Sequence, residues 1–366
     1  MIEARRHVLG AMTLLALMPA ALAAQISISG GASFETYTFA EPANAGVESI
    51  SLLTFPLQAR ATVFRSLSLD VSGAFAQGAV TQSDGTETSV SGPTDTEVAL
   101  TYGFGRDRGS VGAFVSLPTG HSTLTPEEAV AAGIIAADLL PFRITNWGAG
   151  GGAGVLGSYG VSAGAWGFGA SAAYRVAREF EPITEPSFSY QPGNELRVRV
   201  GVDRTFGRAG KLNLALGGWF YGEDAQDDNA LYQSGNRYQA LASYAFRAGY
   251  RSTAVVYGGM LHRENGVFIA GDFDTPSQDL ILAGAGMRMP LGGVTLLPSV
   301  DARVFRREDG LNQGWLTGVG LAANVPAGPL VLTPSARYRF GSAVIAEDVE
   351  SAVSGFAVAL VARIGN

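Results

Sequence analysis

The sequence predicts an all-β protein, a transmembrane antiparallel up-and-down β-barrel of about 16 strands. Three observations support this prediction. Charged residues make up only 16% of the chain, against about 25% in soluble domains. Segments of about ten residues alternate between apolar and polar side chains, as lipid-facing strands do. The breaks between these segments alternate between short and long, which is typical of barrels with short periplasmic turns and longer outer loops.

The first residues have the features of a secretory signal peptide. Arg5 and Arg6 precede an apolar stretch, and the small residues of Ala21-Leu22-Ala23 fit a cleavage site. We therefore expect residues 1–23 to be a signal peptide and residues 24–366 to form the outer-membrane β-barrel. A membrane-anchoring helix is the alternative, but the apolar run is short for a span of about 20 residues and contains Pro19.

The alternation is clearest from Leu196 to Phe206. One face carries Leu196, Val198, Val200 and Val202, and the other carries Arg197, Arg199, Gly201, Asp203 and Thr205. Similar patterns run from Leu330 to Phe340 and from Leu296 to Val304. Because side chains of a strand alternate with a period of two, each segment has one apolar and one polar side.

The breaks come in two lengths, and the two lengths alternate along the chain. Short breaks lie near Arg65-Ser66, Gly105–Gly109, Gly157–Gly164, Gly207–Gly210, Arg247–Arg251, Pro290–Gly293 and Pro326–Pro329. Long breaks lie near residues 38–49, 82–93, 120–146, 180–194, 222–236, 263–278, 307–313 and 341–354. Seven short and eight long breaks separate sixteen strands. Without the glycine-rich hairpin around Gly150 to Ala173, the number would be fourteen.

Aromatic residues stand where the alternating segments end, which favours a membrane barrel over a soluble β-sandwich. Tyr102 and Phe104 precede one short break, and Tyr244 and Phe246 precede another. The long-loop ends carry Trp219, Tyr221, Trp315, Tyr338 and Phe340. Pro298 and Pro334 lie within segments, where a proline without an N–H predicts a bulge or the start of the ladder.

The inward side of the predicted wall is polar and rich in arginine. We expect the pore to be lined by Arg60, Asp70, Glu97, Arg197, Arg199, Asp203, Arg288, Asp301, Arg303, Arg337 and Arg339. These residues either surround a water-filled pore that favours anions or polarised solutes, or form arginine–carboxylate pairs that brace the wall. The set contains seven arginines and four acidic residues, and this excess of positive charge keeps the pore interpretation open.

The third long break differs from the others because it predicts a helix. Thr125 is a good helix cap, Pro126 suits the first helical position and Glu128 completes a capping box. The pattern predicts a helix over 126–139 with an apolar stripe of Val130, Ile134 and Leu139. We expect Thr125, Glu127 and Glu128 to belong to a constriction loop, with the two glutamates facing the inward arginines. A surface cap or a subunit contact is the alternative.

Composition argues against several other functions. The formal net charge of −7 becomes −8 when residues 1–23 are removed, because two arginines and one glutamate are lost, and this disfavours nucleic-acid binding. The chain has no cysteine and three histidines, so we expect no cofactor and no metal site. No recognisable catalytic motif surrounds His121 or His262, so we expect no enzymatic activity.

One stretch resembles the outer-membrane proteins of the meta-pathway of phenol degradation. It runs from Thr94 to Thr125, "TDTEVALTYGFGRDRGSVGAFVSLPTGHSTLT", with Asp95, Glu97 and Leu117-Pro118-Thr119-Gly120 at the matching positions. "WGAGGGAGVLGSYG", starting at Trp147, resembles the glycine-rich hairpin of that family, and the resemblance covers about residues 94–178. The family is similar to the fatty-acid and aromatic-hydrocarbon channels, which implies uptake of hydrophobic compounds.

We therefore expect a bacterial outer-membrane channel for passive uptake of small solutes, aromatic or hydrophobic compounds among them. The alternative is a non-conducting barrel whose long loops bind a partner or a surface ligand. The expected partners are outer-membrane lipid and a small-molecule solute. The arginine-rich inner face fits polar solutes better than hydrocarbons.

Overall fold

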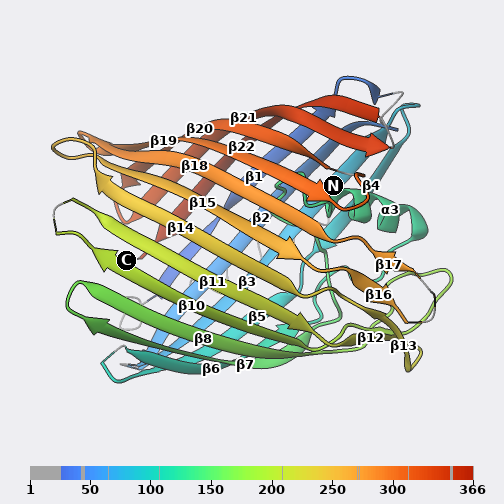
Figure 1. Ribbon diagram of the computed structural model, residues 1–366, viewed down its shortest axis with the longest axis horizontal. Helices are drawn as coiled ribbons and strands as arrows, with labels where there is room; N and C mark the ends of the chain where they lie inside the picture. The colour runs from blue at the N-terminus through green and yellow to red at the C-terminus, as the bar shows by residue number, and fades with distance from the viewer. Residues whose placement is uncertain are drawn as a thin grey trace.

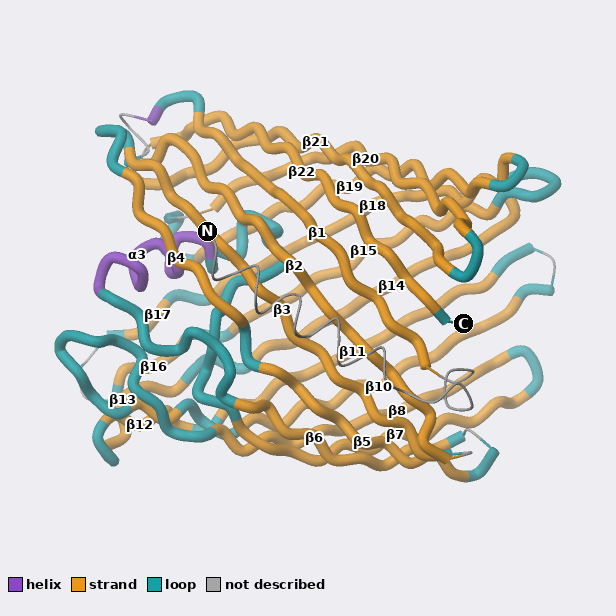
Figure 2. Tube along the Cα trace, turned by 180° about the vertical axis from the view of Figure 1, so that it is seen from behind, coloured by secondary structure: helices purple, strands orange, loops and turns teal. Residues whose placement is uncertain are grey.

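The fold is given by a computed structural model (Figures 1 and 2). It describes residues 26–42, 46–64, 66–106, 108–207, 209–269, 271, 273–311, 313–346 and 349–365. The predicted signal peptide, residues 1–23, lies outside the described residues. Among the described residues, no helix is both long enough and apolar enough to cross a membrane.

One large antiparallel sheet closes on itself to form a barrel. Its strands are β1 (Ile26–Phe39), β2 (Val47–Phe64), β3 (Leu67–Gln82), β4 (Glu87–Pro93), β5 (Thr96–Phe104), β6 (Gly109–Leu117), β7 (Gly152–Ala163), β8 (Trp166–Ala177), β10 (Glu195–Thr205), β11 (Lys211–Tyr221), β14 (Arg237–Arg247), β15 (Thr253–Arg263), β18 (Gln278–Leu291), β19 (Val294–Arg307), β20 (Gln313–Ala327), β21 (Leu330–Ala346) and β22 (Val349–Ile364). The first and last of these pair directly, with Ile28 opposite Ile364, so the described sheet has no open edge between them.

The closed wall has sixteen strand positions, as predicted. The sheet contains seventeen strands, but β4 and β5 pair with the two ends of β3 and together occupy one position. The predicted number of strands depended on the glycine-rich hairpin, which is formed by β7 and β8. These two strands pair along their whole length, from Gly152 opposite Ala177 to Ala163 opposite Trp166. Fourteen strands are therefore excluded.

Two of the predicted long breaks are wrong, because they are largely strand. Residues 87–93 form β4 and pair with β3, and most of residues 341–354 extend the β21–β22 hairpin. The hairpins continue past the point where the outward face stops being apolar, because the inward face still packs against a buried core.

The two sides of the wall differ as the alternation predicts. Val200 is 47% exposed and Leu216 is 59% exposed, and both lie on the outward side. Outward-facing aromatic residues lie near both ends of the strands, as in the contacts Phe206–Tyr244 and Trp315–Phe340. Trp219 and Tyr221 are an exception to the expected belt. They alternate with the exposed Phe220 and therefore lie on the inward side.

The strand prolines neither form bulges nor stand at the start of a strand, so the expectation of one or the other is wrong. Pro298 and Pro334 each interrupt one ladder, and pairing resumes on either side without a change of register. The flanking pairs are Gly286–Ser299 and Met289–Leu296 at the first, and Ala322–Ser335 and Val325–Leu332 at the second. The missing N–H therefore removes local ladder pairs, while the other neighbouring strand still pairs with each proline.

Elements outside the wall gather at the long-loop end of the barrel (Figure 1). A second sheet there has five short strands, β9 (Tyr190–Gln191), β12 (Glu223–Gln226), β13 (Asn229–Gln233), β16 (Gly266–Phe268) and β17 (Asp274–Thr275). They come from three successive long loops, so these loops form one unit, which we call the outer sheet. The helix α3 (Pro126–Ile135) lies at the same end (Figures 1 and 2).

Candidate functional site: a lumen narrowed by the long third loop

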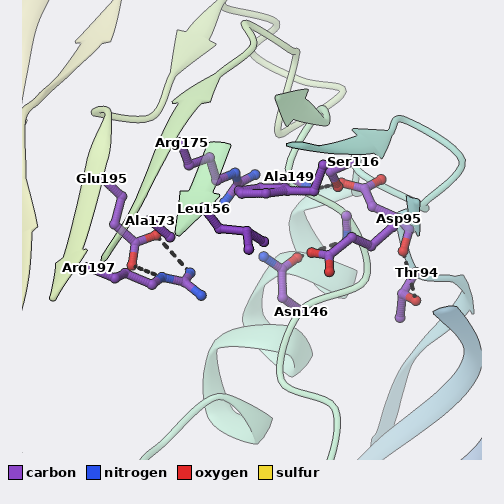
Figure 3. Close-up of a pocket in the computed structure, with 13 residues that line it drawn as sticks. Thr94, Asp95, Ser116, Asn146, Ala149, Leu156, Ala173, Arg175, Glu195 and Arg197 are labelled. Carbon is purple, nitrogen blue, oxygen red and sulfur yellow. Dashed lines mark hydrogen bonds and ion pairs between the residues drawn. The ribbon is translucent and has the colours of Figure 1, made fainter. Parts of the chain in front are cut away.

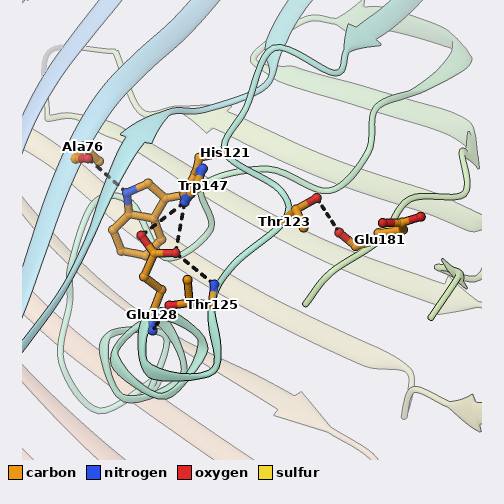
Figure 4. Close-up of polar contacts among 7 residues, drawn as sticks. All are labelled: Ala76, His121, Thr123, Thr125, Glu128, Trp147 and Glu181. Carbon is orange, nitrogen blue, oxygen red and sulfur yellow. Dashed lines mark hydrogen bonds and ion pairs between the residues drawn. The ribbon is translucent and has the colours of Figure 1, made fainter. Parts of the chain in front are cut away.

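The loop between β6 and β7 begins with the predicted capped helix. The Thr125 side chain accepts the Glu128 N–H at 3.2 Å, and the Thr125 N–H donates to the Glu128 carboxylate at 2.9 Å (Figure 4). The capping box is therefore confirmed. Both carboxylate oxygens of Glu128 lie 3.3 Å from His121 Nε2, so Glu128 does not face the arginines of the wall as expected. Glu127 is exposed in the first turn.

The predicted length and stripe of this helix are wrong. The helix ends at Ile135, and its buried residues are Ala131 and Ile135. Val130, which was expected in the stripe, is 56% exposed. Leu139 is buried, but it lies beyond the helix in the segment that turns into the barrel. Because alanines occur on every side of this helix, the sequence pattern does not show which side faces the wall.

Apolar contacts hold the loop against the inner side of β3. The Trp147 ring is 1% exposed, and its Nε1–H donates to the Ala76 carbonyl at 3.0 Å (Figure 4). Gly78 makes room for this contact, because a Cβ there would collide with Ile135 and lie 3.2 Å from the Trp147 ring. The core also contains Tyr37, Phe39, Ile50, Leu52, Val80, Val90, Leu139, Leu140, Phe142, Phe305 and Leu316. The loop thus fills part of the barrel mouth.

A single carboxylate ties both ends of this loop to the wall. Asp95 lies at the break between β4 and β5, where it accepts the N–H groups of Gly120 at 3.0 Å, Ala149 at 2.9 Å and Gly151 at 3.3 Å. Beside it, the Thr119 hydroxyl lies 2.8 Å from the Thr96 hydroxyl and accepts the Thr96 N–H. Three of the residues that carry the family resemblance, Asp95, Thr119 and Gly120, therefore belong to one hydrogen-bonded junction, the Asp95 junction.

The segment 141–149, which we call the lumen strap, lines two cavities that different parts of the wall complete. Near its start, Arg143 Nε lies 3.6 Å from the Glu35 carboxylate of β1. Near its end, Asn146, Gly148 and Ala149 line a cavity that β5, β6, β7, β8 and β10 complete. The lumen strap therefore lies inside the barrel and narrows it at this level.

The cavity beside the lumen strap, which we call the central cavity, has a volume of about 370 Å³. Arg175 and Arg197 lie on one side of it and Asp95 lies on the other, with Asn146 between them (Figure 3). Glu97 lines it from β5 and is close enough to interact electrostatically with Arg197. The Arg197 guanidinium also donates to Glu195 at 2.8 Å.

Two features modify the chemistry of the central cavity. Arg175 donates to the Gly151 carbonyl at 3.2 Å, which fixes its guanidinium beside the Asp95 junction. Phe114 and Leu156 add an apolar surface to the lining. The central cavity therefore offers positive, negative and apolar contacts to one small molecule.

A second group of charges lies where the start of the lumen strap meets the wall. Arg337 forms an ion pair with Asp301 and donates to the Ser299 hydroxyl at 3.1 Å. Arg339 donates to the Tyr37 hydroxyl at 2.8 Å, and its Nε lies 3.9 Å from Asp301. Arg303 lies near enough to interact with Arg339, Tyr37 and Asp301. Three predicted arginines therefore share one predicted carboxylate.

The remaining predicted residues lie toward the short-turn end of the strands. Arg60 Nε is 2.9 Å from Asp70, and Lys211 Nζ is 3.1 Å from Asp203. For Arg199 and Arg288, the described residues supply no ion pair or hydrogen bond. The structure thus groups the predicted pore residues by height in the barrel rather than in one arc.

Several residues of the site escaped sequence reasoning, namely Glu35, Arg143, Asn146, Arg175 and Glu195. Arg175 and Glu195 lie on the polar side of alternating segments, so periodicity alone could have identified them. Asp95 was noticed only through the resemblance. Arg143 and Asn146 lie in a loop, and no local pattern indicates that this loop enters the barrel.

Among the residues that the structure describes, no group of three or more histidine, aspartate and glutamate side chains could hold a metal ion. The closed wall, apolar outside and charged inside, is the structure that crosses bacterial outer membranes. The chain is an outer-membrane β-barrel.

No protein-family model and no curated protein sequence matches the chain. The solved structure of OmpT of Vibrio cholerae is similar, with 12% identity, 93% of this chain and 98% of the other covered, and a TM-score of 0.42. The CymD monoaromatic hydrocarbon channel has 8% identity, coverage of 93% and 88%, and a TM-score of 0.44. A bacterial polysaccharide outer-membrane secretin has 10% identity, coverage of 92% and 98%, and a TM-score of 0.45.

Proposed function

We propose that this barrel is a channel through which small solutes cross the outer membrane passively. The observation that carries the proposal is the central cavity of about 370 Å³ between the lumen strap and the wall. A lumen strap that narrows a charged lumen without filling it is suited to select solutes by size and polarity. The predicted pore-lining residues supply the charge, and the lumen strap supplies the constriction.

The lining of the central cavity supports a more specific solute class. Asp95 and Glu97 of the β4–β5 side oppose Arg175 and Arg197, so a molecule between them experiences a transverse field that orients dipoles. Phe114 and Leu156 add a surface for an apolar body. We propose small dipolar solutes with an apolar part, of which polar aromatic compounds are an example. The resemblance to the phenol meta-pathway proteins is consistent with an aromatic part.

Planar-bilayer recording tests the channel. We expect stable unitary conductance from the refolded wild type. Replacing the two arginines of the central cavity by glutamine should shift the reversal potential in a salt gradient toward cation preference, because positive charge is removed from the path. Arg306→Gln, on the outward side near the long-loop end, is the matched control and should leave the reversal potential unchanged. Uptake by liposomes would then identify the solute.

A non-conducting barrel whose loops bind a partner is the second candidate. The buried apolar core between the loop and the inner wall favours it, because this core closes part of the barrel mouth. A bilayer that stays sealed over many insertions of folded protein would support this candidate and contradict the channel.

We also propose that the barrel has no catalytic role. His121 lies beside Glu128, and His262 Nδ1 lies 2.9 Å from Asp279. Among the described residues, neither histidine is hydrogen-bonded to a serine or threonine hydroxyl that could serve as a nucleophile. Incubation of the folded protein with phospholipid should release no fatty acid.

A further inference from the structure

Arg204 of the wall lies on the outward side, near the short-turn end of β10. Leu196, Val198 and Val200 of β10 are exposed outward, and Arg204 follows on the same side of the strand. Its guanidinium carbon lies 4.6 Å from the centre of the Trp166 ring and 4.8 Å from the centre of the Phe206 ring. Two aromatic faces thus hold a positive charge against the outer surface, where cation–π attraction stabilises it.

The position of Arg204 corresponds to a membrane interface. It lies one residue before the end of β10 at Thr205, next to a short turn, which is the periplasmic end of an outer-membrane barrel. Arginine stems lie along apolar surfaces while their charged ends reach the polar headgroups. The other charged residues at outward positions of the described wall strands, among them Asp279 and Arg306, lie toward the long-loop end.

An apolar groove begins directly beside Arg204 on the same outer surface. Across the sheet, the row of Arg204, Leu212, Tyr244 and Val256 is followed by the row of Val202, Leu214, Ala242 and Gly258. The next row contains Val200, Leu216, Ala240 and Met260. Because successive rows are about 7 Å apart along the strands, the groove runs from the level of Arg204 toward the middle of the membrane.

Small side chains make this groove, and larger ones border it. Ala240, Ala242 and Gly258 leave the surface low, while Phe168 and Leu216 rise beside them. The groove has a volume of about 680 Å³, and its lining is almost entirely apolar. Its shape and polarity fit a hydrocarbon chain, and the charge that an occupant must satisfy lies at its periplasmic end.

We propose that this groove and Arg204 form a binding site for a phospholipid of the periplasmic leaflet. The lipid phosphate binds the Arg204 guanidinium, and one acyl chain lies in the groove over Ala242 and Gly258. A phospholipid is the occupant that the geometry favours, because the positive charge lies at the interface and the apolar groove points from it toward the bilayer centre. Lipopolysaccharide phosphates belong to the opposite leaflet, at the long-loop end.

Native mass spectrometry of the detergent-purified full chain with added phosphatidylglycerol tests this site. We expect one tightly bound lipid on the wild type. Arg204→Gln removes the charge and Ala242→Phe fills the groove, and each should weaken the adduct about tenfold, as expected for loss of a charge-assisted hydrogen bond or of the apolar contact. Arg306→Gln and Ala302→Phe make the same changes on the outward side of β19 and should bind like the wild type.

Three results would overturn the proposal. The first is a wild type without a bound lipid, and the second is equal binding by all five proteins. The third is a wild type that forms oligomers which Ala242→Phe dissociates, because a second copy of the chain would then cover the groove. Each variant counts as folded if its electrophoretic band still migrates differently when the sample is not boiled.

Discussion

At the scale of single residues, Asp95 shows how a short motif acquires a structural role. Its carboxylate accepts three backbone N–H groups from both ends of the loop that crosses the lumen. A carboxylate has two oxygens with enough lone pairs for several donors, and an amide side chain has one oxygen. Aspartate at a break in a strand is therefore suited to hold two loop ends that approach from different directions.

Replacing Asp95 with asparagine should loosen the loop while the barrel remains. Hydrogen bonds to a charged acceptor contribute about 1.5–3 kcal/mol each, so we expect a loss on the order of 3 kcal/mol in the local stability of residues 118–151. Limited proteolysis of the folded protein should cut this loop at least tenfold faster. Asp84→Asn, at an exposed hairpin tip, is the control. Equal cutting rates would show that Asp95 does not anchor the loop.

Glu128 gives the loop a pH dependence with a defined sign. Burial raises the pKa of its carboxyl, but the Thr125 N–H and the His121 ring outweigh burial and hold the pKa below its ordinary value of 4.5. A carboxyl with a depressed pKa stabilises the folded state above its unfolded pKa and loses this contribution as the pH falls through the folded pKa. The loop should therefore lose stability as the pH falls below 4.5.

The variant Glu128→Gln tests this dependence, because glutamine keeps a capping side chain but does not titrate. Near-ultraviolet circular dichroism reports on the buried Trp147 ring during thermal unfolding. We expect the difference in unfolding temperature between wild type and variant to shrink as the pH is lowered through this range. A difference in unfolding temperature that does not change with pH would show that the charge of Glu128 does not stabilise the loop.

At the scale of elements, the wall strands could be predicted from the sequence and the path of the third loop could not. Alternation is local, so the strand from Leu196 to Thr205 is visible in its own residues. The capping box of α3 is local as well. The buried side of α3 depends on Gly78 and Trp147, which lie far away in the chain, and periodicity contains no information about such contacts.

Deleting Pro126 to Leu139 should raise the unitary conductance markedly, because the lumen strap loses the helix that holds it against β3. Gly78→Val should act in the same direction, since its side chain would meet Ile135 and Trp147. Gly133→Ala is the control, because a Cβ at this helical position meets no atom within 4 Å. Unchanged conductance and ion selectivity after the deletion would place the helix outside the conduction path.

At the scale of the whole molecule, closure of the wall follows from pairing between its first and last strands. Twelve residue pairs join β1 and β22, from Ile28–Ile364 to Phe39–Val353. The even number of strands follows from the alternation of turns and was predictable. The charged groups inside the barrel could not be predicted, because Glu35 of the first strand meets Arg143 of the lumen strap only in the closed barrel.

The folded protein should give a far-ultraviolet spectrum dominated by β-structure in detergent, and its band should migrate differently when the sample is not boiled. Closed barrels resist detergent because all their backbone hydrogen bonds are satisfied between strands. A spectrum dominated by helix, or a protein that remains in solution without detergent, would contradict the barrel.

The outer sheet determines where the surface of this protein accepts foreign sequence. Because three loops share its strands, an epitope tag inserted between Asp228 and Asn229 would separate β12 from β13 and disturb segments as distant as β9 and β17. The tip of the β3–β4 hairpin belongs to no such unit, and a Cβ at Gly85 would meet nothing within 4 Å. A tag displayed at Gly85 should therefore label intact cells, whereas the same tag at Asp228 should lower the amount of folded barrel.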